Sequence, residues 1–183
     1  MAVPFDKIKA DFSELRDFVI NDLNLITNAP KGGNYAAALL VVTACEAAGS
    51  LRYGSTDGGL DFFREYLIPK KWSPVSKSIY DALRNGLAHS FVTKAILKAT
   101  NKPVELGISW SNENHFEYDP SRATVFINIQ EFSKSLKEAF RRYEEELKEH
   151  AELRDRFIRC RKKQRVYEVR NPTEKSEWKK LLD

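Results

Sequence analysis

A nearly all-apolar segment, Ala36–Leu51, constrains the fold of this chain more than any other feature of its sequence. Its apolar residues would cover every side of a helix, and its many alanines would let neighbouring elements approach closely. Such a helix needs partners on several sides, so the segment predicts the centre of a helical bundle. The longest apolar stretch, Tyr35–Gly49, is interrupted by Glu46 and is shorter than a membrane span, so we expect no membrane insertion.

The size and composition of the chain indicate one folded domain. It has 183 residues, of which 42% are hydrophobic and 31% charged, enough for one core and too few for two comfortable domains. Met1–Ile8 lacks the cationic and apolar pattern of a secretory signal. Cys45 and Cys160 are isolated from any metal-ligand spacing, which favours free thiols in a reducing cytoplasm. We therefore expect a single cytoplasmic domain over residues 1–183.

Helical periodicity and breakers divide the first third of the chain. Apolar residues at three- and four-residue spacing predict a helix over Asp6–Thr27, which the breakers at 28–33 would end, and a second helix from near Asn34. The stretch 54–59 reads as a flexible loop in which Asp57 could cap a short helix over Leu60–Leu67.

The segment Ser73–Thr93 combines a core-facing stripe with a line of polar residues. Ser73 as a cap and Pro74 at the first helical position predict the start of a helix. The stripe consists of Val75, Ile79, Ala82, Leu83, Gly86, Leu87 and Phe91. The polar line consists of Asp81, Asn85 and His89, with Arg84 beside it. On an ideal helix Arg84 and His89 point about 140° apart, so a bent arginine or a second copy of the helix must bring them to one ligand.

The sequence Arg84-Asn85-Gly86-Leu87-Ala88-His89 resembles the motif of the HEPN superfamily (higher eukaryotes and prokaryotes nucleotide-binding domains), an arginine and a histidine separated by four to six residues. A polar residue usually follows the arginine there, and Asn85 occupies that position. The resemblance covers roughly Tyr35–Phe91 and the helix after Gln130.

This resemblance implies an all-helical bundle that forms a homodimer, places two motifs in one cleft and often cuts RNA without a metal. By the same resemblance Arg84 would hold the scissile phosphate and His89 would perform acid–base chemistry. Asn85, one turn before His89, could orient its ring or touch the ribose. Proteins of this kind include toxins and defence or RNA-processing nucleases, some of which have lost catalysis, and their partners include antitoxins and nucleotidyltransferases.

Two acidic residues are expected near the motif. Glu46 is the one carboxylate of its apolar segment, and burying it unpaired would be costly. It therefore either pairs with Arg84 and orients it, as an acidic residue of an earlier helix does in HEPN proteins, or points to solvent. Asp81, on the polar line, is expected to support the site beside it.

Between about residues 100 and 129 the apolar period changes from 3.6 to 2. The alternating residues are Val104, Leu106, Ile108, Trp110, Phe116, Tyr118, Val125, Ile127 and Ile129. Turn sequences at 111–114 and 119–122 separate the runs, so we predict a small antiparallel meander inserted between the motif helix and a long C-terminal helix. His115, beside the first turn, is expected to be solvated and stays outside the site.

From Gln130 the helical period resumes, and an unbroken helix to Lys163 would be about 50 Å long, so its end should overhang the bundle. The net charge is +4, but Arg154–Arg165 alone carries +6, which leaves −2 for the remainder. This patch within the extension 154–183 is a candidate nucleic-acid-binding surface. Its cations are Arg154, Arg156, Arg159, Arg161, Lys162, Lys163 and Arg165. Trp178 could stack on bases or dock on the bundle.

Two classes of function fit a mainly α, HEPN-like bundle of this kind. The first is a metal-independent endoribonuclease, a toxin or a defence or RNA-processing effector, that acts as a homodimer. The alternative is a non-catalytic module that binds a nucleotide, RNA or a protein. The three histidines and two cysteines show no ligand spacing, and no glycine-rich phosphate loop is present, so we expect neither a metal nor a cofactor.

Overall fold

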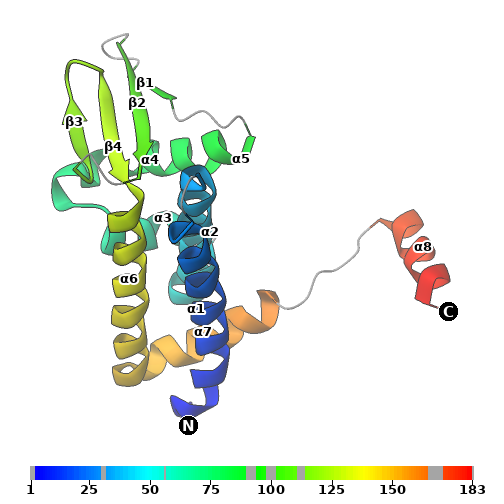
Figure 1. Cartoon of the computed structure of the whole chain (residues 1–183). Coiled ribbons are helices and arrows are strands. Elements are labelled where there is room, and N and C mark those ends of the chain that lie inside the picture. Colours follow the sequence, from blue (N-terminus) through cyan, green and yellow to red (C-terminus); the bar gives the residue numbers. More distant parts are fainter. Residues whose placement is uncertain are drawn as a thin grey trace.

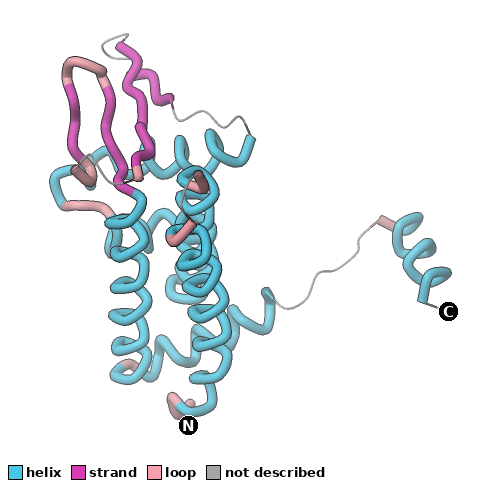
Figure 2. Tube along the Cα trace, viewed as in Figure 1, coloured by secondary structure: helices cyan, strands magenta, loops and turns pink. Residues whose placement is uncertain are grey.

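The computed structural model describes residues 3–29, 32–55, 57–89, 94–97, 102–110, 114–164 and 171–182. Helices α1 (Asp6–Thr27), α2 (Asn34–Tyr53) and α6 (Ile129–Glu149) pack against one another, and α7 (Ala151–Gln164) crosses the end of this bundle (Figure 1). A small sheet lies at the opposite end (Figure 2). The prediction of a mainly helical fold with a small sheet is thus confirmed.

Helix α2 is the centre of the bundle, as its sequence predicts. It packs against α1, α3, α6 and α7, and its side chains are buried on several sides. The predicted start near Asn34 and the predicted bounds of α1 are also confirmed. By length and composition α2 could cross a membrane, the one such helix in the described part of the chain, but half of its apolar window is buried inside the bundle.

The contact between α2 and α3 (Gly58–Phe62) is a direct approach of two backbones. A Cβ on Gly49 would overlap the Gly58 carbonyl oxygen, and a Cβ on Gly58 would overlap the Gly49 carbonyl. The expectation of a flexible loop through Gly59 is therefore wrong: Gly58 and Gly59 are buried in the first turn of α3. Asp57 stands at the N-cap position without a side-chain hydrogen bond, and a π-helical turn, η1 (Phe63–Leu67), continues the helix.

A half-buried arginine ties three elements of the bundle together. Arg52 of α2 pairs with Glu65 of η1 and with Glu146 of α6, each at 2.8 Å. Tyr66 donates a hydrogen bond of 2.6 Å to the same Glu146 carboxylate. The Tyr53 hydroxyl donates to Glu65 in the same way, so an arginine and a hydroxyl hold each carboxylate and the charges are compensated where the three elements meet.

The sheet is mixed, so the predicted antiparallel meander is wrong. Its strands are β1 (Lys94–Leu97), β2 (Lys102–Ser109), β3 (Glu117–Asp119) and β4 (Thr124–Asn128), in the order β1-β2-β4-β3. β4 pairs in parallel with β2 and antiparallel with β3. Four of the five residues of β4 are buried whereas β3 is short and largely exposed, so β4 takes an inner place and β3 an edge.

The long C-terminal helix is broken at His150, which corrects the prediction of an overhanging helix. His150 is extended (φ −109°, ψ 110°), and Arg154 donates hydrogen bonds of 2.8 and 3.0 Å to the carbonyls of Leu147 and Lys148 that the break frees. The change of direction packs α7 against α1 and α2 and buries Phe157 in the core. A further helix, α8 (Pro172–Leu182), follows.

His115 differs from the expectation of a solvated side chain. Its ring lies against Phe116 and Phe132, at centroid distances of 4.4 and 5.7 Å, and neither ring nitrogen has a hydrogen-bond partner among the described residues. Burial lowers its pKa to about 4, and the charge of Glu131 only partly opposes that shift.

We predict that His115 weakens the fold in acid. The unfolded chain takes up its proton near pH 6.5 and the folded chain near 4, so stability is lost as the pH falls through this interval. Urea unfolding at pH 7 and 4.5 should show that His115→Leu removes roughly 2 kcal/mol of the wild-type loss. An equal loss in both proteins would contradict a neutral buried imidazole.

The glycine contact gives a second prediction. Gly49→Ala should reduce the free energy of unfolding by about 2–3 kcal/mol, because neither backbone can move aside without separating α2 from α3. Thr43→Ala, on an exposed position of the same helix, is the control and should change it by less than about 0.5 kcal/mol. Equal effects in denaturant unfolding would show that the helices do not touch at this point.

Candidate functional site

The motif lies in a helical segment built from four pieces. A 3₁₀ turn, η2 (Lys70–Val75), leads into α4 (Ser76–Asp81), a π-helical turn, η3 (Ala82–Gly86), and α5 (Leu87–His89). The predicted cap by Ser73 is wrong, because Pro74 lies inside η2 and α4 begins later without a side-chain cap. Ile79, Leu83 and Leu87 are buried as the predicted stripe requires, whereas Val75 is exposed.

The π-helical turn changes the geometry around Arg84 and Asn85. It adds one residue to the turn, and such insertions occur frequently at functional sites. The polar line and the 140° angle were expected for an ideal α-helix, and the π-helical turn changes both. The wider turn reduces the angle between the backbone positions of Arg84 and His89.

Glu46 holds Arg84, which confirms the predicted pair and excludes the alternative of a carboxylate pointing freely to solvent. Arg84 Nε lies 2.8 Å from Glu46 Oε1. The hydroxyl of Tyr80 donates a 2.7 Å hydrogen bond to the same oxygen. The same carboxylate oxygen thus forms an ion pair with Arg84 and accepts a hydrogen bond from Tyr80. The Arg84 side chain remains 53% exposed.

Gly59 of α3 makes this arrangement possible. A Cβ at this position would overlap the Tyr80 hydroxyl and would lie 2.9 Å from both Cα and Cδ of Glu46. A side chain here would separate the two residues. The glycine pair that packs α3 on α2 therefore also brings α4 close enough for Tyr80 to reach Glu46.

Arg84 stands between two surface depressions. One, of about 370 Å³, is lined by Leu39, Val42, Thr43, Glu46, Arg84, Asn85 and Ala88. It is called the α2 groove below. The other, of about 340 Å³, is lined by Glu46, Asp57, Leu60, Asp61, Lys77, Tyr80, Asp81 and Arg84. It is called the acidic depression, because it presents four carboxylates and two cations.

The other predicted site residues fall on both sides of Arg84. Asn85 is exposed and lines the α2 groove. Asp81 lines the acidic depression and pairs with Lys77 at 2.5 Å. The backbone of His89 ends α5, but its side chain lies outside the described part of the structure. Arg84, Asn85 and Glu46 are therefore brought together, and Asp81 lies on the far side of Arg84.

The basic segment is divided between structural and exposed cations. Arg154 also donates to the Val3 carbonyl at 2.6 Å, Arg156 donates to the Arg52 carbonyl at 2.7 Å, and Arg161 pairs with Glu14 at 3.3 Å. The side chains of Arg159, Lys162 and Lys163 are exposed. Arg165 lies outside the described residues. Three of the seven predicted nucleic-acid contacts thus have roles in holding α7.

Tyr80 is the site residue that sequence reasoning missed. It precedes Arg84 by four residues, a spacing that places both on one side of a helix, but an aromatic residue beside an apolar stripe reads as core. Its ring is indeed buried against Phe63, with centroids 5.3 Å apart. Desolvation and the bond to Glu46 raise the pKa of Tyr80, so the hydroxyl stays a donor near neutrality.

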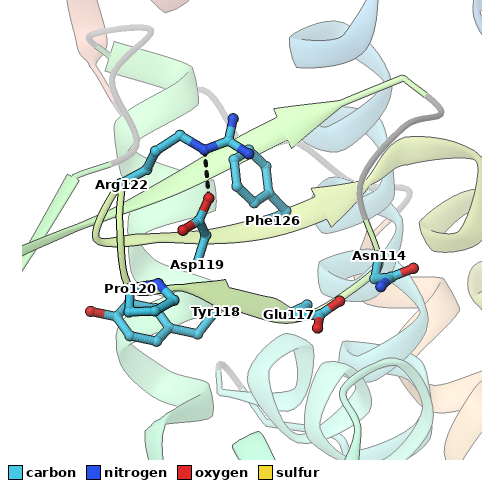
Figure 3. A pocket seen from close by; sticks show the side chains of 7 residues that line it. All are labelled: Asn114, Glu117, Tyr118, Asp119, Pro120, Arg122 and Phe126. Carbon is cyan, nitrogen blue, oxygen red and sulfur yellow. Dashed lines mark hydrogen bonds and ion pairs between the residues drawn. The ribbon is translucent and has the colours of Figure 1, made fainter.

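A second polar surface lies on the β3–β4 hairpin, and no residue of the motif lines it (Figure 3). Arg122 pairs with Asp119 at 2.6 Å and stacks over the Phe126 ring at 4.5 Å. Its cation is therefore already held by an acid and an aromatic ring. The described residues contain no group of histidine, cysteine, aspartate or glutamate suited to a metal ion.

Comparison with family models, with curated proteins and with solved structures finds no match for this chain. Membership of the HEPN superfamily therefore stays a proposal.

The ion pair between Arg84 and Glu46 can be tested by measuring the coupling energy of the two side chains. A double-mutant cycle with Glu46→Gln and Arg84→Met should give a coupling of about 0.5–1 kcal/mol in unfolding experiments, because both side chains are partly exposed. The coupling should fall with added salt. Purely additive effects at low salt would show that the pair does not form in solution.

Proposed function

We propose that this protein is a metal-independent endoribonuclease of the HEPN type that acts as a homodimer. The observation that supports this most is the ion pair of Arg84: Glu46, which accepts a hydrogen bond from Tyr80, holds one end of a guanidinium whose side chain is exposed at the α2 groove. Arginine presents a planar fork of donors that matches phosphate oxygens. A fixed but accessible arginine is suited to bind a phosphodiester.

The chemistry needs three tasks. A base removes the proton from the ribose 2′-hydroxyl, whose oxygen attacks phosphorus; the P–O5′ bond breaks, and an acid protonates the leaving oxygen. The products are a 2′,3′-cyclic phosphate and a free 5′-hydroxyl, so no water or metal is consumed. The Nη atoms of Arg84 would stabilise the charge that grows on the phosphate. His89 would transfer protons, since imidazole titrates near neutrality.

Two copies of the chain would complete this site. Each contributes one histidine at the motif, whereas the reaction uses a base and an acid. A two-fold interface along the α2 groove would place the motif helices opposite each other and supply both groups. Asn85, exposed in the groove, would then face the ribose or the imidazole of the partner subunit.

The second candidate is a non-catalytic interaction module, which the acidic depression favours. Asp57, Asp61 and Asp81 lie within one hollow beside Arg84, and although Asp61 and Asp81 pair with Arg64 and Lys77, the hollow keeps a net negative charge. Carboxylates repel an RNA backbone and attract a basic protein surface. This function would use the depression for a basic partner and would leave RNA intact.

The nuclease proposal predicts the behaviour of two variants. His89→Ala should reduce the cleavage rate of single-stranded RNA by about 10²–10⁴-fold, the usual contribution of a general acid or base. Arg84→Ala should reduce it by about 10²-fold or more. Cleavage should persist in EDTA and should yield cyclic phosphate ends, measured by gel electrophoresis and mass spectrometry.

Matched controls lie on the same chain. His150→Ala removes an exposed histidine at the α6–α7 break, and Arg141→Ala removes an exposed arginine that pairs with Glu138 on α6. Both variants should retain full activity. Wild-type dimer that leaves RNA intact, or equal activity in His89→Ala and His150→Ala, would overturn the proposal and favour the interaction module.

A further inference from the structure

Helix α8 has an apolar side without a partner among the described residues. It has 11 residues, and every one whose side chain is described is exposed. Trp178 and Leu181 are 48% and 77% exposed and lie three residues apart, so they share one side of the helix. An isolated helix of this length is marginal in water. A tryptophan and a leucine on its surface would be stabilised by contact with another apolar surface.

Helix α2 offers such a surface, and α7 already covers one part of it. The side chain of Gln164 donates to the Ala47 carbonyl and to Ser50, so α7 ends on the outer side of α2. Farther toward the start of α2, the same side presents Ala36 and Thr43, which are exposed to solvent in the described part of the chain, and Leu39, which is partly buried. The α2 groove lies on this open part.

The chain is long enough to connect the two surfaces. Seven residues lie between Gln164 and Pro172, and the eight steps from one to the other span about 26 Å when extended. Ala47 and Leu39 are about 12 Å apart along the helix axis. Helix α8 can therefore extend the contact of α7 along α2 within one chain.

Charge complementarity favours the same placement. Three of the four carboxylates of the acidic depression are paired, Glu46 with Arg84, Asp61 with Arg64 and Asp81 with Lys77, so the depression has an excess of one negative charge. Lys179 and Lys180 directly follow Trp178 in α8, and Lys180 pairs with Glu177 of the same helix at 2.7 Å. With Trp178 over the groove, Lys179 would lie on the side of the molecule that carries this one excess negative charge.

We propose that α8 docks on α2 of its own chain, with Trp178 in the α2 groove beside Arg84. The occupied groove then excludes both RNA and a second copy of the chain, so the C-terminal helix holds the site closed. This regulatory consequence rests on the proposed nuclease function, whereas the docking does not.

The docking can be measured on the full chain without RNA. Protein containing 5-fluorotryptophan gives a fluorine NMR signal for each tryptophan, and Trp178→Phe assigns the signal of Trp178. A spin label is attached at Thr43→Cys in a Cys160→Ser background, since Cys45 is buried. We expect the label to broaden the signal of Trp178. A label at Arg141→Cys, on the exposed surface of α6, should not.

Mixed samples separate the possible partners. Fluorinated protein without a label is combined with labelled protein without fluorine, so broadening there can come only from a second copy. We expect none. Equal broadening in the mixed sample and in the doubly labelled one, after allowance for the fraction of labelled chains, or none from the label at position 43, would overturn docking in cis.

A second variant tests the docking without a spin label, which could itself disturb the groove. In unlabelled protein, Leu39→Asp should increase the response of the Trp178 signal to the exchange of H₂O for D₂O, because the indole becomes more exposed. Leu25→Asp, at an exposed leucine of α1, is the control. Equal responses in these variants and the wild type would also overturn docking. Leu181→Asp should release α8 and raise RNA cleavage; if docking is found but cleavage does not rise, only the regulatory role fails. If no variant cleaves RNA, the proposed nuclease function fails and the docking still stands.

Discussion

The approach of α3 to α2 through glycine is the constraint on which the rest of this structure depends. At Gly49 and Gly58 two backbones touch where no Cβ fits, and one residue later Gly59 leaves the space in which Tyr80 meets Glu46. The same contact therefore closes the core and sets the distance from which Glu46 holds Arg84. A larger residue at any of the three positions would disturb both the fold and the site, because they share one interface.

The elements that the sequence predicts well are those whose signal is local and periodic. Six turns of amphipathic pattern define α1, and an apolar run with one carboxylate defines α2 and requires a cation for Glu46. Arg84 could be chosen as that cation because an unpaired buried carboxylate is costly and the motif helix had to pack nearby. The sequence alone also allows Glu46 to point to solvent, and the ion pair with Arg84 in the structure decides between the two.

The features that sequence reasoning missed depend on contacts between distant segments. Alternation and turns identify strands, but they do not tell which strand pairs with which, so the parallel pair of β2 and β4 was beyond their reach. The apolar period continues through His150 because both α6 and α7 bury one side, which hides the change of direction between them. The sequence predicts a loop at Gly58 and Gly59 because glycine occurs both in turns and where two helices approach closely. The residue type alone does not distinguish the two cases. Tyr80 joins the site by its hydroxyl alone, while its ring behaves as core.

Glu46 holds Arg84 in the structure, and the proposed chemistry uses Arg84 to bind the phosphate. The side-chain N–H of this arginine can be observed directly. The most direct measurement follows the Nε–H signal of Arg84 by nitrogen–proton NMR while a 2′-O-methyl RNA, which cannot be cleaved at its 2′ position, is added. If Glu46 fixes this arginine at a phosphate site, the signal should be protected from exchange in the free protein, lose that protection in Glu46→Gln, and shift on binding of the RNA. A signal that exchanges rapidly in the wild type and does not move with RNA would contradict an arginine prepared for a phosphate.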